Sequence, residues 1–307
     1  MPAEAGGISQ NMKTSSAGIY LKLVAVTMFW GGTFIAGRLI ANLMPHMMAA
    51  GGRFLVACAL LVPLAWKLEG GLPRLTLKQA MATFALGATG IFLYNICFFK
   101  ALSLMPASRT ALLIALNPIV TALAQALFFR ERLAPRKWFG ILIAFAGAAV
   151  IISRGDLQGA LHDISQSLGA GEFIMFCAVC AWAAYTIIGR HALKGLTPIA
   201  ATTYATLWGL LLLLIGASTE IADMDWSVLN WQVLASIVYL GAFGTAVGFV
   251  WYYEGVQTLG AARTAVFNNL VPVFGVTFGA LMLGEPILPS MISGGLLVIA
   301  GVTLTNR

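Results

Sequence analysis

Charged residues are scarce in this chain. Asp, Glu, Lys and Arg make up 9% of its 307 residues, whereas hydrophobic residues make up 60% and the mean hydropathy is +0.89. Soluble globular domains carry roughly 25% charged residues, so a soluble fold is excluded. Long polar connections are also missing, because the longest one, residues 154–169, is too short to form a domain. The sequence therefore contains no soluble catalytic, nucleotide-binding or regulatory module.

Cysteine and histidine are too few and too scattered for a metal or redox centre. The four cysteines all lie in apolar segments, which gives no disulfide framework. Cys177 and Cys180 form a C-x-x-C pair, but inside an apolar helix we interpret it as small-residue packing. The three histidines are dispersed, and no metal-ligand cluster or nucleophile–base pair is evident. We therefore expect no metal, no cofactor and no enzymatic activity, with a membrane-embedded enzyme as the alternative from another class.

Apolar segments near 20 residues are abundant, and each is long enough to cross a hydrocarbon core of about 30 Å. None shows the strict alternation of a barrel strand, so the segments are expected to be helical. The sequence predicts an all-α integral membrane protein with ten transmembrane helices. The predicted spans are residues 19–42, 46–66, 79–99, 107–129, 136–153, 171–190, 199–216, 231–253, 262–283 and 288–304.

The net charge is +7, and the distribution of the basic residues indicates membrane topology rather than binding to nucleic acid. The polar residues 1–18 lack the apolar core and cleavage site of a signal peptide, and we expect them to form a cytoplasmic tail. Lys and Arg then lie mainly inside, as the positive-inside rule requires, and both termini are cytoplasmic. Thirteen basic residues fall inside (Lys13, Lys22, Lys67, Arg74, Lys78, Arg130, Arg132, Arg136, Lys137, Arg190, Lys194, Arg263, Arg307), four fall outside (Arg38, Lys100, Arg109, Arg154), and Arg53 lies within a span. Arg38, Arg53 and Arg190 are expected at span ends or facing the bundle.

Most of the sequence is one unit duplicated. Residues 106–153 align without a gap on residues 260–307, at an offset of 154, with fourteen identical pairs among 48. Four residues of the first span, Trp30, Ile35, Gly37 and Arg38, recur 152 residues later as Trp182, Ile187, Gly189 and Arg190. The predicted organisation is a first five-helix repeat (19–153), an extracytoplasmic loop (154–169) and a second five-helix repeat (170–307). Because five is odd, the second repeat inserts inverted, which is the plan of many secondary transporters with a substrate site at the repeat interface.

Each copy carries Ala-x-Arg-Thr-Ala, a central Pro and a Glu that closes the fourth span. The second copy continues Leu283-Gly284-Glu285 and later Gly301-Val302, whereas the first departs with Phe129-Arg130-Glu131. From about residue 20 onward, the chain resembles the drug/metabolite transporter superfamily and its EamA-type repeat. The resemblance implies a ten-helix exporter in a bacterial inner membrane, most similar to the bacterial exporters of aromatic amino acids.

Polar groups deep in the predicted spans are amides and hydroxyls, without Asp or Glu. Such an interior suits a zwitterionic or neutral solute better than a cation, and it lacks a midplane carboxylate for proton exchange. Aromatic residues at matched depths are typical either of core packing or of a cavity for a large flat side chain. The predicted cavity residues are Trp30, Thr33, Tyr94, Asn95, Phe98, Asn117, Trp182, Tyr185, Tyr239, Trp251, Tyr252, Asn268 and Asn269.

Two matched prolines, Pro118 and Pro272, lie near the middle of the fourth and ninth spans. Proline there removes a hydrogen bond and frees a carbonyl. A static kink and a hinge are both consistent with this pattern, and we predict hinges.

Four charged residues at the ends of the same spans are candidate gates. Arg109 and Arg263 begin these spans, and Glu131 and Glu285 close them. We predict that Arg109 pairs with Glu285 on one side of the membrane and Arg263 with Glu131 on the other. The alternative is that each residue anchors its helix at the interface.

Taken together, these features predict an exporter of small amphipathic metabolites, aromatic amino acids foremost, that works by alternating access through a central cavity. We expect a uniporter or facilitator that functions as a monomer in the lipid bilayer. Alternatives are an exporter of other amino acids, drugs or metabolites, with or without proton coupling, and a channel.

Overall fold

The computed structural model describes residues 16–129, 133–156, 169–192, 195–259, 264 and 267–306, and every element in these ranges is helical. In chain order the elements are α1 (Ser16–Ala41), α2 (His46–Glu69), α3 (Leu77–Leu86), η1 (Gly87–Leu93), α4 (Tyr94–Leu104), α5 (Ala107–Ile114), α6 (Asn117–Phe129), α7 (Pro135–Ile152), α10 (Ala170–Ala192), α11 (Pro198–Glu220), η2 (Ile221–Asp223), η3 (Trp226–Val228), α12 (Trp231–Gly241), η4 (Ala242–Val247), α13 (Gly248–Leu259), η5 (Asn268–Leu270), α15 (Val271–Leu283) and α16 (Pro289–Asn306). The all-α prediction is confirmed.

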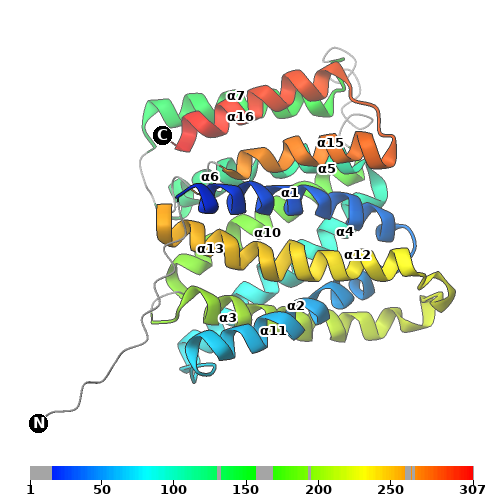
Figure 1. Cartoon of the computed structure of the whole chain (residues 1–307). Helices are drawn as coiled ribbons and strands as arrows, with labels where there is room; N and C mark the ends of the chain where they lie inside the picture. Colours follow the sequence, from blue (N-terminus) through cyan, green and yellow to red (C-terminus); the bar gives the residue numbers. More distant parts are fainter. Residues whose placement is uncertain are drawn as a thin grey trace, which may run out of the picture.

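Ten helical stretches of the described chain follow the ten predicted spans in order. Eight are long and apolar enough to cross a membrane, and two shorter apolar helices, Asn268–Leu283 and Pro289–Thr305, complete the set. The ninth predicted span starts at residue 262, and residues 260–263 lie outside the described residues, as do most of the predicted loop (157–168) and the tail up to residue 15. The start of α1 and the end of α16 lie at the same end of the bundle (Figure 1).

The third and eighth spanning helices contain a π-helical segment at the same place in each repeat. Segment η1 follows α3, and segment η4 follows α12. Both coincide with the sequence Leu-Gly-Ala-x-Gly, which begins at Leu86 and again at Leu240, an offset of 154 residues. A π turn shifts the backbone hydrogen bonds from four to five residues and is frequent at functional sites. A duplicated sequence pattern therefore specifies a duplicated local irregularity.

The fourth and ninth spanning helices break where the matched prolines lie. Helix α5 ends at Ile114, and the next two N–H groups donate to carbonyls three residues earlier before α6 begins. Pro118 is the second residue of α6, and Pro272 is the second residue of α15, which follows the 3₁₀ turn η5. Proline is tolerated in the first turn of a helix, where its missing N–H would have no partner. Each proline thus begins a new helical segment instead of kinking a continuous one, and the hinge stays a prediction.

Repeat-equivalent helices contact each other through small residues. Helices α7 and α16 lie side by side (Figure 1). A Cβ atom added at Gly140 would lie 2.7 Å from the carbonyl oxygen of Gly301, and one added at Gly147 would lie 2.6 Å from that of Gly294. The start of α7 therefore meets the end of α16, so these equivalent helices are antiparallel. Since each glycine has its counterpart 154 residues on, the contact is two-fold symmetric, and the missing side chains allow the close approach.

Two glycines where the π segments begin, Gly87 at the start of η1 and Gly241 directly before η4, make a second symmetric pair of contacts. A Cβ atom at Gly87 would lie 2.6 Å from the carbonyl oxygen of Ala205 on α11, and one at Gly241 would lie 2.5 Å from that of Arg53 on α2. Arg53 and Ala205 are 152 residues apart, the same offset as Trp30 and Trp182. Each π-containing helix therefore packs against the second helix of the other half.

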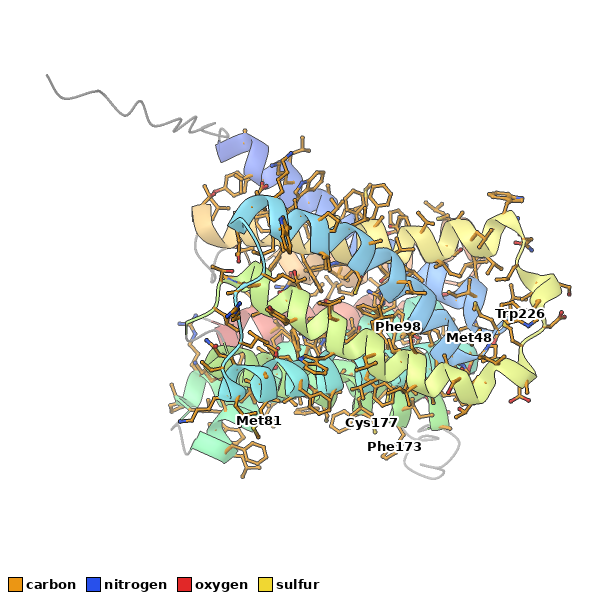
Figure 2. All side chains as sticks on the ribbon, turned by 90° about the horizontal axis from the view of Figure 1, so that it is seen from below. Met48, Met81, Phe98, Phe173, Cys177 and Trp226 are labelled. Carbon is orange, nitrogen blue, oxygen red and sulfur yellow. The ribbon has the colours of Figure 1, made fainter. Side chains whose placement is uncertain are left out.

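Apolar side chains cover the outside of the bundle as well as its inside. Phe98 lies within the bundle and is 1% exposed, whereas Phe173 lies at its edge and is 65% exposed (Figure 2). Leu127 and Leu281 are also largely exposed. An extended apolar outer surface is suited to lipid rather than to water.

Candidate functional site

The buried guanidinium of Arg53 is the centre of the candidate site. Arg53 is the eighth residue of α2, about 10 Å along the helix from its start, and it is 8% exposed. Its Nε donates to Oγ1 of Thr245 at 3.3 Å, and Nη1 donates to Oδ1 of Asn95 at 3.0 Å. We refer to Arg53, Asn95 and Thr245 as the polar centre. Within the described part of the chain, no carboxylate forms an ion pair with Arg53.

The π segments orient the two neutral partners of Arg53. The side-chain Nδ2 of Asn95 donates to the carbonyl of Ile91 in η1 at 2.7 Å, and the Thr245 hydroxyl donates to the carbonyl of Leu240 at 3.1 Å. Because these donors are engaged, the Asn95 and Thr245 side-chain oxygens are left to accept from the guanidinium. Dipoles therefore solvate the cation without neutralising it. This corrects the purely neutral interior predicted from the sequence, and Arg53 faces the bundle.

Trp30 and its neighbours form the first aromatic cluster, beside the polar centre. The Trp30 indole donates to the carbonyl of Gly244 at 3.1 Å, and its ring lies 5.4 Å from that of Tyr252. A Cβ atom at Gly244 would lie 2.6 Å from Cγ2 of Thr33 and 3.9 Å from Nη2 of Arg53. Trp30, Thr33 and the guanidinium therefore converge on the same glycine.

A second aromatic cluster joins α4 to α10. The Trp182 ring centroid lies 5.1 Å from that of Tyr94 and 5.1 Å from that of Tyr185, and Tyr94 stacks on Phe98 at 5.8 Å. Tyr94 immediately precedes Asn95 in α4, so this cluster is continuous with the polar centre. Offset and tilted ring pairs of this kind are also the arrangement that would accept a further aromatic ring.

Two other predicted cavity residues contact α1 through Phe29. The Tyr239 hydroxyl donates to the Phe29 carbonyl at 3.0 Å. The ring of Trp251 lies 5.9 Å from that of Phe29 and 5.8 Å from Nζ of Lys22. Tyr239 and Trp251 therefore contact Phe29, the residue that directly precedes Trp30 in α1.

Three of the predicted cavity amides, Asn117, Asn268 and Asn269, lie at the broken helices. Asn268 donates to the Tyr252 hydroxyl at 3.5 Å, which links it to the first aromatic cluster, whereas Asn269 donates to Thr303 at 3.4 Å and so faces α16. The Oδ1 atoms of Asn117 and Asn268 are buried and accept no hydrogen bond. Unpaired buried acceptors cost free energy, and a ligand donor would relieve that cost.

Arg109 forms a different ion pair from the one predicted. It pairs with Glu172 of α10 at 2.8 Å, with 6% of each side chain exposed, and its Nη2 donates to the Ile152 carbonyl at 2.6 Å. The predicted partner, Glu285, is engaged elsewhere. Arg109 therefore links α5 to α7 and α10 in this structure.

Glu285 caps a helix of the other half. Its two carboxylate oxygens accept from the backbone N–H groups of Ala107 at 2.8 Å and Ser108 at 2.9 Å, at the start of α5. A helix N-terminus offers free N–H groups and a positive dipole end, which explains why the carboxylate binds there rather than to Arg109. The other predicted pair, Glu131 with Arg263, lies outside the described residues and stays a prediction.

Carboxylate contacts between halves recur on α2 and α11, which are repeat equivalents. Glu220 at the end of α11 accepts from the N–H groups of Met47 at 2.9 Å and Met48 at 3.1 Å, at the start of α2. Glu69 at the end of α2 accepts from the hydroxyl of Thr197, the N-cap of α11. A carboxylate at the end of each helix thus binds the start of its equivalent.

Sequence reasoning missed Thr245 and Glu172, and it named Arg53 without a role. The duplicated Leu-Gly-Ala-x-Gly pattern could have indicated both π segments, and with them Thr245. Arg53 is basic and lies well inside a predicted span, which is a functional signal on its own. Nothing in the sequence indicates that Glu172 binds Arg109, because that contact depends on helix packing.

Comparison with known proteins identifies the family. The model of the EamA-like transporter family matches residues 17–153 and 169–307. The chain is 28% identical over 284 residues to "Uncharacterized transporter YyaM" of Bacillus subtilis, covering 92% of each chain. It is 30% identical over 297 residues to "Probable terminal-alkyne amino-acid exporter" of Streptantibioticus cattleyicolor, covering 96% of this chain and 95% of that one.

A solved crystal structure of a protein superposes with a TM-score of 0.65 at 18% identity, over 95% of this chain and 98% of that chain. Likeness at this level of identity shows the fold alone. The sequence matches and the apolar helices together establish a multi-pass membrane transporter, and the chain belongs to the EamA-like transporter family.

Proposed function

We propose that the protein exports small amphipathic metabolites, with aromatic amino acids as the leading substrates, by alternating access between the two halves. The observation that carries the proposal is the second aromatic cluster, in which Trp182 and Tyr94 adjoin Asn95 of the polar centre. A flat apolar side chain and a polar head group would find complementary surfaces next to each other there.

One relative supports an amino-acid substrate. The protein from Streptantibioticus cattleyicolor is named as an exporter of an amino acid that carries a terminal alkyne, a small apolar group. Its similarity extends over 96% of this chain. We extend the amino-acid class to this protein and assign the aromatic preference to the ring clusters.

The symmetric contacts support inverted repeats and alternating access. Helices α7 and α16 are repeat equivalents and run antiparallel, as two repeats inserted in opposite directions require. Glu285 of the second half caps α5 of the first, and Glu131 at the equivalent position would cap the start of the ninth spanning helix on the opposite side. Opening one cap while closing the other, about the breaks at Pro118 and Pro272, would expose the polar centre to each side in turn.

The remaining assignments belong to the same proposal. The protein would act as a monomeric uniporter or facilitator in a bacterial inner membrane, with both termini cytoplasmic. Residues of both halves form the polar centre, which is consistent with a functional monomer. The described spans place no carboxylate at the polar centre to exchange a proton with the substrate.

Transport by purified protein in liposomes tests the proposal. Labelled L-phenylalanine should show saturable counterflow against unlabelled L-phenylalanine, L-tyrosine or L-tryptophan without a pH gradient. Trp182→Ala should lower that flux by about tenfold, because it removes the ring that joins Tyr94 to Tyr185. Phe173→Ala is the matched control, because it shortens an aromatic side chain on the same helix that is exposed at the bundle edge.

Counterflow confined to other amino acids, drugs or metabolites would favour the second candidate, an exporter with another substrate. Flux without counterflow would indicate a channel. A strict dependence on a proton gradient would contradict uniport.

A further inference from the structure

We propose that Arg53 binds the carboxylate of the transported substrate, so that the protein selects amphipathic carboxylates by their anionic group rather than by an amine. This assignment deepens the proposed function and rests on it for the transport step. The binding claim stands on the geometry of the polar centre and is tested separately.

The bonding of Arg53 leaves its charge available. The guanidinium has five N–H donors in a planar fork that matches a carboxylate with two parallel hydrogen bonds. Only Nε and Nη1 are engaged by described residues, each with one neutral oxygen. Nη2 donates to none of them, and it would lie 3.9 Å from a Cβ atom added at Gly244. A second pair of acceptor oxygens from a ligand would complete the fork.

A buried guanidinium without a counter-charge is costly inside a membrane, and a ligand anion would supply that counter-charge. Cations inside a membrane bundle normally pair with a carboxylate or face a substrate path. The carboxylates of the described ion pairs, Glu172 and Glu254, are engaged by Arg109 and Lys22. Glu285 and Glu220 cap helix starts. None of these acidic groups neutralises Arg53, so an anionic substrate is the partner that its position calls for.

The equivalent place in the second half shows that packing does not require an arginine. Ala205 makes the same carbonyl contact to Gly87 that Arg53 makes to Gly241. The counterparts of Asn95 and Thr245, at an offset of 154, are the apolar residues Phe249 and Ile91. Ile91 fills the space beside Gly209 on α11. The same backbone arrangement therefore forms with apolar side chains alone, and the polar centre is an addition to the scaffold.

The structure offers much less to an ammonium group. Among the described residues, the unpaired Oδ1 atoms of Asn117 and Asn268 are neutral acceptors. A dipole stabilises a cation less than a guanidinium stabilises an anion. Loss of the amine should therefore cost little affinity, and loss of the carboxylate should abolish binding.

Three probes with the same ring separate the two groups: L-phenylalanine, 3-phenylpropionate and 2-phenylethylamine. Binding to the purified full-length protein is measured by calorimetry and by the shift of its thermal unfolding midpoint. We expect both carboxylates to bind with affinities within about tenfold of each other, since they share the charge-assisted contact. The amine should bind at least about thirtyfold more weakly.

Two substitutions test Arg53 itself. Arg53→Gln should weaken both carboxylates by about thirtyfold or more, whereas Arg53→Lys keeps the charge and should retain part of the affinity. Asn95→Asp places a carboxylate at the position that accepts from Nη1 and neutralises the guanidinium internally. It should abolish carboxylate binding while the unfolding midpoint stays the same or rises.

Equal binding of the amine and the carboxylates would overturn the proposal, as would undiminished carboxylate binding by Asn95→Asp. If Arg53→Gln does not fold, the probe series and Asn95→Asp still decide the matter. The same measurements with isovalerate separate this proposal from the proposed function. Arg53-dependent binding of isovalerate without binding of either aromatic carboxylate would keep the anion site and reject the aromatic preference.

Discussion

The two halves of this protein share a backbone plan but differ in chemistry at one matched place. On one side, Arg53 on α2 faces Asn95 and Thr245, next to the second π segment. On the other side, Ala205 on α11 faces the first π segment and its apolar residues. Duplication supplied two equivalent positions, and only one of them carries a charge. The difference separates the backbone contacts, which both halves make, from the charge of Arg53, which has no counterpart at Ala205 and which we propose for the ligand.

The largest expected effect comes from copying the charge to the apolar side. Ala205 is fully buried, and Ala205→Arg would place a cation where the counterparts of Asn95 and Thr245 are the apolar residues Phe249 and Ile91. We expect destabilisation by about 3 kcal/mol or more relative to Ala205→Met, which adds similar length without charge. Denaturant unfolding in detergent measures both variants. Equal stability of the two variants would mean that either half tolerates the cation, which would contradict the difference between the two matched positions.

Gly→Ala substitutions at matched positions of the shared scaffold should lower the stability of the protein equally in both halves. Gly87→Ala places a Cβ atom 2.6 Å from a backbone carbonyl oxygen of the other half, and Gly241→Ala places one at 2.5 Å. Each should destabilise the protein by roughly 1–3 kcal/mol through overpacking. Gly51→Ala is the control, because its nearest neighbour, Cδ2 of Leu214, would lie 4.0 Å away. A large cost at only one of the two π segments would contradict their equivalence.

The carboxylate caps offer a comparison between the two ends of the bundle. Glu285→Gln keeps the shape but removes the charge that accepts from Ala107 and Ser108, and should weaken that closure by about 1–2 kcal/mol. Glu131→Gln should weaken the opposite closure by a similar amount. Cysteines introduced beside the polar centre, labelled from each side, should shift their accessibility in opposite directions. A shift in the same direction for both variants would contradict the proposal that the two carboxylate caps open alternately.

The smallest expected effect concerns the two matched tryptophans. Trp30 donates to the Gly244 carbonyl, whereas Trp182 is held by ring contacts with Tyr94 and Tyr185. Trp30→Phe should therefore cost about 1 kcal/mol more stability than Trp182→Phe. Transport should show the reverse order, because Trp182 belongs to the cluster that we assign to the substrate ring. Thermal unfolding and counterflow on the same preparations check both orders.

The helical spans and the duplication could be predicted from sequence because they depend on local composition and on matched motifs. Arg53 could be located but not interpreted, since its partners come from residues 42 and 192 positions away in the chain. The actual partners of Arg109 and Glu285 are also distant in sequence, because Arg109 pairs with Glu172 and Glu285 binds the start of α5. Helix starts attract carboxylates, but which start lies near which carboxylate depends on how the helices pack. Sequence alone shows matched charges without showing their contacts.

Counterflow across liposomes containing only this protein measures whether the carboxylate or the amine of the substrate is recognised during transport. Vesicles loaded with 3-phenylpropionate, with 2-phenylethylamine or with neither are diluted into labelled L-phenylalanine. If Arg53 binds the carboxylate, internal 3-phenylpropionate accelerates uptake and internal 2-phenylethylamine does not, and the acceleration is lost in Asn95→Asp. Acceleration by the amine equal to that by the carboxylate would contradict this assignment.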